Sequence, residues 1–129
     1  MRAVLSIAAV AALAGCAVNQ PVDWSKADYG PYPQDYEQIV KQHMQERLKD
    51  PDSAKYQFPG KPVAGYEHIA GKTDFGWYLC PLVNAKNSYG AYTGYQQYYI
   101  MIKNGIVISS FNGAAKYQRF MVEQMCGKR

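Results

Sequence analysis

Histidine, cysteine and long apolar runs are scarce in this chain, and each shortage excludes a class of protein. The 129 residues contain two histidines and three cysteines, and their spacing includes neither the CxxC nor the HxxxH pattern of common metal sites. No apolar run approaches the ~20 residues that a transmembrane helix requires. Walker, GxSxG, HExxH and dinucleotide-binding motifs are also missing. We therefore predict a protein that is not an enzyme and that needs no cofactor or metal.

The composition is nevertheless that of one folded domain. Hydrophobic residues make up 48% of the chain and charged residues 19%, which is enough apolar material for a small core and too little charge for a disordered polyelectrolyte. The most unusual count is the 12 tyrosines.

The N-terminal residues have the pattern of an export signal, with Arg2 followed by an apolar run over residues 3–13. The segment Leu13-Ala14-Gly15-Cys16 resembles the lipobox of bacterial lipoproteins, which are cleaved before the cysteine. This resemblance implies that Cys16 carries two or three fatty acids such as palmitate. Because Ala17 rather than aspartate follows, it also implies the outer membrane, with the protein facing the periplasm. The alternative is an ordinary signal peptide that is cleaved nearby, with Cys16 either a free thiol or part of a disulfide bond.

This interpretation divides the chain into three parts. We expect residues 1–15 to be the signal peptide, residues 16–33 a lipidated flexible tether, and residues 34–129 a single domain.

Cysteine parity agrees with lipidation. If Cys16 is acylated, Cys80 and Cys126 remain as a pair, which we expect to form a disulfide bond in an oxidising compartment. In the chain-entropy treatment such a bond stabilises the fold by roughly 4 kcal/mol. A zinc site that uses both cysteines with His43 and His68 is the alternative.

Hydrophobic periodicity and turn residues predict a helix, then strands, then a second helix. The first helix is expected between a cap at Asp35 and a stop at Asp50-Pro51, before an Asx-type turn or a second cap at Asp52-Ser53. Its expected apolar side is Tyr36, Ile39, Val40, Met44 and Leu48.

Four strands are expected next, at residues 63–69, 75–83, 95–102 and 106–111, with hairpin turns at 71–74 and 103–105. The order indicates a two-layer α+β domain in which both helices cover one face of an antiparallel sheet. The last helix is expected at residues 114–125, with an apolar side made of Tyr117, Phe120, Met121, Gln124 and Met125.

The most distinctive segment lies within residues 83–95, where tyrosines recur every three residues. Because side chains alternate along a strand, this spacing cannot keep the rings on one face, and residues 87–94 are predicted to form a structured loop. Exposed rings there would suit a sugar or a protein partner. Alternatively, the rings fill the core while Asn87 and Ser88 satisfy the loop backbone. The candidate binding surface comprises Asn84, Lys86, Asn87, Tyr89, Tyr92 and Tyr95.

This segment also carries a family resemblance. Together, the sequence DPDSA at residues 50–54, Cys80 and the sequence VNAKNSYGAYTGY at residues 83–95 are similar to a pattern in small exported proteobacterial proteins of unassigned function. The resemblance implies a shared fold and brings no activity.

The basic residues are concentrated in the C-terminal half. Residues 75–129 contain six basic residues and one acidic residue, Glu123, whereas residues 16–74 have a small acidic excess. This asymmetry could favour anionic lipid headgroups, lipopolysaccharide phosphates or acidic glycans, but the scattered positions favour a solvated surface without a partner. Export argues against nucleic acid as the ligand.

The function predicted from these features is binding rather than catalysis. The carboxylates Asp50, Asp52, Glu67 and Asp74 lie near predicted turns, where capping is the ordinary explanation. We predict an outer-membrane-anchored periplasmic lipoprotein that acts as a non-catalytic binding or accessory domain for an envelope protein or glycan. One alternative is an inhibitor of host lysozyme, a class of similarly small, disulfide-bonded lipoproteins whose motifs are absent here. The other is a small cell-wall hydrolase.

Overall fold

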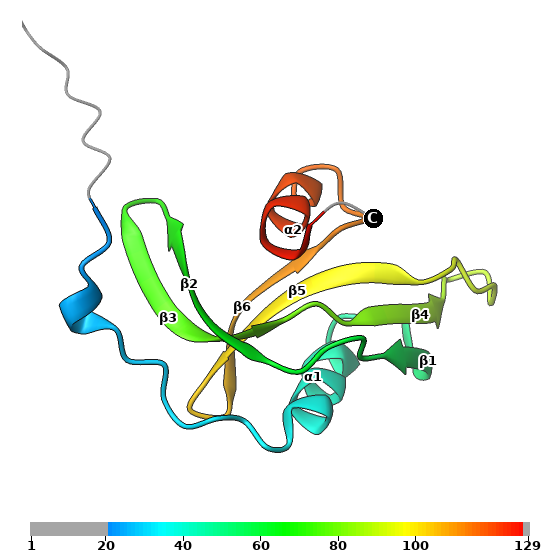
Figure 1. Cartoon of the computed structure of the whole chain (residues 1–129). Helices are drawn as coiled ribbons and strands as arrows, with labels where there is room; N and C mark the ends of the chain where they lie inside the picture. Colours follow the sequence, from blue (N-terminus) through cyan, green and yellow to red (C-terminus); the bar gives the residue numbers. More distant parts are fainter. Residues whose placement is uncertain (1–20, 128–129) are drawn as a thin grey trace, which may run out of the picture.

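The computed structural model of the chain describes residues 21–127. Two α-helices and an antiparallel sheet confirm the α+β class (Figure 1). In chain order, the elements are the 3-10 turn η1 (Trp24–Lys26), α1 (Tyr36–Gln45), β1 (Asp50–Gln57), β2 (Val63–Ile69), β3 (Lys72–Leu79), β4 (Leu82–Lys86), β5 (Gln96–Lys103), β6 (Ile106–Asn112) and α2 (Arg119–Cys126).

The sheet has six strands rather than the four expected. β1 pairs with β4, and β2, which follows β1 in the chain, pairs with β3. β5 pairs with β3 and β4, and β6 pairs with β5. The predicted strand at 75–83 is divided at Cys80-Pro81, because Pro81 has no N–H for the ladder. The Pro81 carbonyl still accepts a hydrogen bond from Tyr98 N at 2.9 Å, which keeps the two halves beside β5.

β1 replaces the turn expected after the first helix. α1 ends at Gln45, well before the predicted stop at Asp50-Pro51, and residues 50–57 form a strand instead of an Asx-type turn. The register between β1 and β4 shifts between Asp50 and Lys55. A bulge of this kind in an edge strand is where a sheet tolerates proline. The pairing with β4, rather than local propensity, therefore makes this segment a strand.

Both hairpin turns use two residues in the left-handed conformation. Asn104 and Gly105 have φ angles of 52° and 75°, which confirms the predicted turn between β5 and β6. The turn between β2 and β3 is formed by Ala70 and Gly71, with φ angles of 51° and 79°. β3 consequently begins at Lys72, inside the segment predicted to be the turn.

The two helices lie on opposite faces of the sheet, so the prediction that both cover one face is wrong. Figure 1 shows α2 above the sheet and α1 below it. Neighbouring β5 residues point to opposite sides and belong to different cores. The core under α1 contains Val40, Met44, Leu79, Val83, Ile100 and Ile102, and the core under α2 contains Tyr99, Met101 and Val122.

α2 is shorter than predicted, and its buried side differs from the expected one. It begins at Arg119 after a series of turns, so Tyr117 lies outside the helix, and both Tyr117 and Phe120 are exposed. The predicted disulfide bond is confirmed, because Cys126 at the end of α2 is bonded to Cys80 between β3 and β4. α2 is therefore tied covalently to the sheet.

The described part of the predicted tether belongs to the folded domain. Tyr32 packs edge to face against Trp77 of β3, with ring centroids 5.1 Å apart. The Trp77 indole donates a hydrogen bond to the Gly30 carbonyl at 3.0 Å. The predicted domain start at residue 34 is thus too late, because aromatic residues within 21–33 cover the part of the sheet that α1 leaves open.

Candidate functional site

The predicted loop exists between β4 and β5, and one asparagine organises it. Asn87 Oδ1 accepts hydrogen bonds from Tyr89 N at 2.9 Å and from Ala91 N at 3.2 Å. The Asn87 backbone N–H also donates to the Ala91 carbonyl at 2.9 Å. Gly90 has a φ angle of 78°, a conformation that favours glycine. The loop is therefore held in shape by its own polar groups.

A second asparagine closes the base of the loop. Asn84 Oδ1 accepts a hydrogen bond from Gly94 N at 3.1 Å. The amide oxygens of both Asn84 and Asn87, which we predicted as ligand contacts, are thus engaged with the loop backbone. The alternative in which Asn87 satisfies the loop backbone therefore holds for its amide oxygen, and Asn84 has the same role.

Tyr92 fastens the loop to β1. Its hydroxyl donates a hydrogen bond to the Ser53 carbonyl at 2.9 Å. Its ring lies under two ammonium groups, with Lys55 Nζ at 4.6 Å and Lys86 Nζ at 5.6 Å from the centroid. Within residues 21–127, neither lysine has a carboxylate within ion-pair distance. The loop is therefore rigid and carries positive charge.

All three predicted rings are exposed to solvent. Tyr89 is 96% exposed, and Tyr92 and Tyr95 are 41% and 42% exposed. Further along β5, Tyr98 is half-buried and Tyr99 is fully buried. The tyrosines of this region thus divide between surface and core, and we call Tyr89, Tyr92, Tyr95, Lys55 and Lys86 the loop surface.

A second candidate site was missed in the sequence. Glu67, which we interpreted as a turn residue, lies inside β2 and is only 7% exposed. Its Oε2 atom is buried without a hydrogen-bond partner. Burial raises the pKa of Glu67, and the carboxylate of Asp74 acts in the same direction. The hydroxyls of Ser109 and Tyr99 oppose this shift, although neither is aligned for a hydrogen bond to Oε2.

Glu67 belongs to the wall of a cavity of about 610 Å³, a volume typical of small-molecule sites. One side of this cavity is the β2 edge, a second is α2, and a third comes from the segment before α1. The lining residues are Trp24, Tyr29, Ala64, Gly65, Tyr66, Glu67, His68, Tyr78, Met121, Gln124 and Met125. We call this space the Glu67 cavity.

Glycines shape the sheet beneath the Glu67 cavity. A Cβ atom on Gly65 would lie 2.6 Å from the Tyr78 ring, so only glycine lets that ring lie across β2. A Cβ atom on Gly76 would lie 2.8 Å from the Ile102 carbonyl oxygen and 2.9 Å from Met101 Cγ. Larger residues at these positions would push the strands and rings apart.

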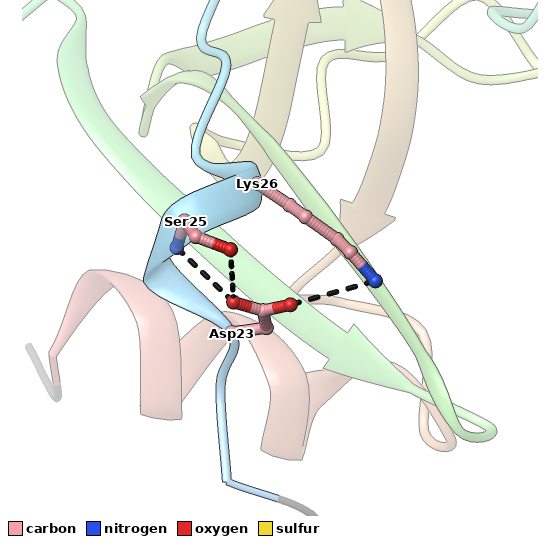
Figure 2. Close-up of polar contacts among 3 residues, drawn as sticks. All are labelled: Asp23, Ser25 and Lys26. Atoms are coloured by element: carbon pink, nitrogen blue, oxygen red, sulfur yellow. Dashed lines mark hydrogen bonds and ion pairs between the residues drawn. The ribbon is translucent and has the colours of Figure 1, made fainter.

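The outer wall is positioned by the turn η1. Asp23 accepts hydrogen bonds from Ser25 N at 3.1 Å and from Ser25 Oγ at 2.6 Å, and its carboxylate lies 3.4 Å from Lys26 Nζ (Figure 2). The hydrogen bonds from Ser25 lower the pKa of Asp23. This cap orients Trp24, whose ring packs edge to face on Tyr66 at 5.1 Å.

The histidines do not form a metal centre. Among residues 21–127, no group of three His, Cys, Asp or Glu side chains could hold a metal ion, and both cysteines of the proposed zinc alternative are in the disulfide bond. His43 Nε2 is buried without a partner, and burial lowers the pKa of His43. His68 Nδ1 lies 2.7 Å from Thr73 Oγ1, in a hydrogen bond between neighbouring strands.

The predicted lipidation site, Cys16, lies outside the described residues, as do the signal peptide and the first part of the predicted tether. Within residues 21–127, no helix is long and apolar enough to cross a membrane.

The chain matches no family model, no curated protein and no solved structure.

Proposed function

We propose that the mature protein is a lipoprotein held in the outer membrane by fatty acids on Cys16, and that its domain binds an envelope glycan or protein without catalysis. The observation that carries this proposal is a rigid loop that holds an aromatic ring in solvent. Tyr89 is 96% exposed, and the neighbouring loop backbone is fixed by Asn87. Exposed tyrosines on an ordered loop are typical of recognition surfaces, because little conformational freedom is lost on binding.

The position of the loop supports a partner beyond the membrane surface. In Figure 1 the β4–β5 loop lies at the right, and the first described residues lie at the left, beside the β2–β3 hairpin. A domain anchored through its N-terminus would then present the loop surface away from the lipid. Lys55 and Lys86 add positive charge there, which suits an acidic glycan or an acidic protein surface.

A cell-wall hydrolase is the second candidate, and one observation favours it. Glu67 and Asp74 are direct cross-strand partners in β2 and β3, and burial raises the pKa of Glu67. Two carboxyl groups with different environments are the usual acid and base of glycoside hydrolysis.

Sedimentation with purified peptidoglycan sacculi tests both functions. The full chain with Cys16→Ser, which cannot be acylated, should pellet with the sacculi and release no fragments. Tyr89→Ser combined with Tyr95→Ser should abolish this pelleting and leave the melting temperature within about 2 °C. The matched control is Tyr117→Ser, because Tyr117 is 90% exposed at a different place, and it should pellet like the parent chain.

The other outcomes separate the alternatives. Soluble fragments would favour the hydrolase, and protection of sacculi from added lysozyme would favour the inhibitor. If nothing pellets, a photoreactive group at position 89 should crosslink a specific envelope protein in cells, and failure of both experiments would contradict the proposal. Cell fractionation tests the anchor separately: Cys16→Ser should leave the membrane fraction, and retention there would argue against lipidation.

A further inference from the structure

The Glu67 cavity contains an acidic group without a cationic partner. Glu67 is 7% exposed, and the cation on the facing strand, Lys72, is paired with Asp74 at 3.0 Å. A buried carboxyl group without a partner costs stability, and buried polar groups in folded proteins are otherwise satisfied. The hydroxyl groups beside this carboxyl group, those of Tyr99 and Ser109, are neutral, so a cation for it would have to come from outside the chain, through the cavity whose wall includes Glu67.

The rest of the lining suits a positive charge. The cavity wall includes the rings of Trp24, Tyr29, Tyr66 and Tyr78, and aromatic faces attract cations. The only basic side chain in this lining is His68, and its Nδ1 is already engaged with Thr73. Because side chains alternate along β2, the Tyr66 ring and the Trp24 ring packed on it lie on the other face of this strand from Glu67, whereas the Tyr78 ring shares the face of Glu67. A cation beside Glu67 would therefore meet one carboxyl group and the Tyr78 ring, and no lysine or arginine of the lining would repel it.

The side of the cavity formed by α2 is suited to an apolar group rather than to a charged one. Met121 and Met125 contribute flexible thioether chains, and Gln124 contributes an amide that can accept a hydrogen bond. The volume of about 610 Å³ is far larger than an ammonium ion alone would fill. The occupant should therefore carry its cationic group on a larger body.

We propose that the Glu67 cavity is a binding site for a primary ammonium group carried on an aliphatic chain or a sugar, distinct from the loop surface. The ammonium group donates to the Glu67 carboxyl, and the attached carbon body packs against the Tyr78 ring and against Met121 and Met125. A lysine side chain of another protein and an amino sugar both present this chemistry. The site is independent of the loop surface, so neither proposal depends on the other.

Titration followed by methyl NMR tests this site in the full chain with Cys16→Ser and labelled methionines. Pentylamine and 1-pentanol are matched in length and differ in charge, because an alkylamine is protonated at pH 7. Pentylamine should shift the methyl signals of Met121 and Met125 in a saturable manner, and 1-pentanol should bind at least ten-fold more weakly. Met44, in the core on the opposite face, should not respond to either compound.

Variants test the role of the carboxyl group. Glu67→Gln should weaken pentylamine binding at least ten-fold, whereas the control Glu46→Gln, which alters an exposed carboxyl group after α1, should leave it within about three-fold. Two further comparisons identify the kind of amine that the cavity accepts. Glucosamine compared with glucose tests an amino sugar, and Nα-acetyl-lysine amide compared with norleucine amide tests a lysine side chain.

Equal binding of amine and alcohol, or unchanged amine binding by a folded Glu67→Gln chain, would overturn the proposal. The comparison of amine with alcohol in the parent chain decides the question even if Glu67→Gln does not fold. The Tyr89→Ser and Tyr95→Ser chain should bind pentylamine normally, so a failure of the loop surface would be recognised separately.

Discussion

Removal of the Cys80–Cys126 disulfide bond should strongly destabilise the packing of α2 against the sheet. α2 has eight residues, and Val122 is its only buried residue. Its position therefore depends strongly on the bond from Cys126 to the break between β3 and β4. Without that bond we expect α2 to separate from the sheet before the rest of the domain unfolds.

The size of the effect follows from the length of the closed loop. The two cysteines are 46 residues apart, and the chain-entropy relation then gives about 4 kcal/mol at 25 °C. For a domain of this size, each kcal/mol corresponds to roughly 4–8 °C in melting temperature. The melting temperature should therefore fall by about 15–30 °C.

The measurement is thermal unfolding by circular dichroism of Cys80→Ala combined with Cys126→Ala, with Cys16→Ser in both the variant and its reference. Because Met121 and Met125 line the Glu67 cavity, their methyl signals should also lose their dispersion at temperatures where the sheet is still folded. A fall of less than about 5 °C, with these signals unchanged, would refute the reasoning. Noncovalent packing would then be enough to hold α2.

Three further changes test the loop and the Glu67 cavity. Asn87→Ala removes two acceptor contacts in the loop and should cost about 1–2 kcal/mol by denaturant unfolding, while Asn87→Asp, which keeps the acceptor, should cost less. Gly76→Ala places a Cβ atom 2.8 Å from the Ile102 carbonyl oxygen and should cost about 1–3 kcal/mol; a neutral result would show that the sheet adjusts freely. The pKa of Glu67 is raised in the folded protein, so the unfolded chain loses this proton first, and the stability penalty grows as pH rises above about 4.3 and is complete above the folded pKa. Glu67→Gln should therefore raise the melting temperature more at pH 8 than at pH 4, and an equal change at both pH values would contradict the burial argument.

Local sequence signals predicted the hairpins but not the edge strand. The pair Asn104-Gly105 adopts the left-handed conformation of a two-residue turn almost independently of its surroundings, so the β5–β6 hairpin is readable from the chain. β1 contains Asp50, Pro51 and Asp52, none of which favours a strand. It forms because β4 supplies its hydrogen-bond partners, and no pattern within residues 50–57 reveals this.

The two candidate sites also differ in whether the sequence predicted them. The three-residue spacing of tyrosines excluded a regular strand and predicted the loop, whereas the exposure of Tyr89 and the bonds to Asn87 were decided by the structure. Glu67 was overlooked because its surroundings include Tyr99 and Ser109 of β5 and β6, which are distant in sequence. The available signal was an acidic residue in the interior of a predicted strand, two positions after Gly65 and therefore on the same face.

Turn chemistry, helical periodicity and cysteine parity act over a few residues or on simple counts, so the α+β class, the β5–β6 hairpin and the Cys80–Cys126 pair could be derived from the chain alone. Which face of the sheet each helix covers, and whether residues 21–32 pack against β3, depends on contacts between segments far apart in sequence. Side chains on a strand alternate whatever covers them, and the alternation of β5 is the same whether one face or both are buried. Only the folded chain assigns α1 to one face and α2 to the other, and only that assignment closes a cavity around Glu67.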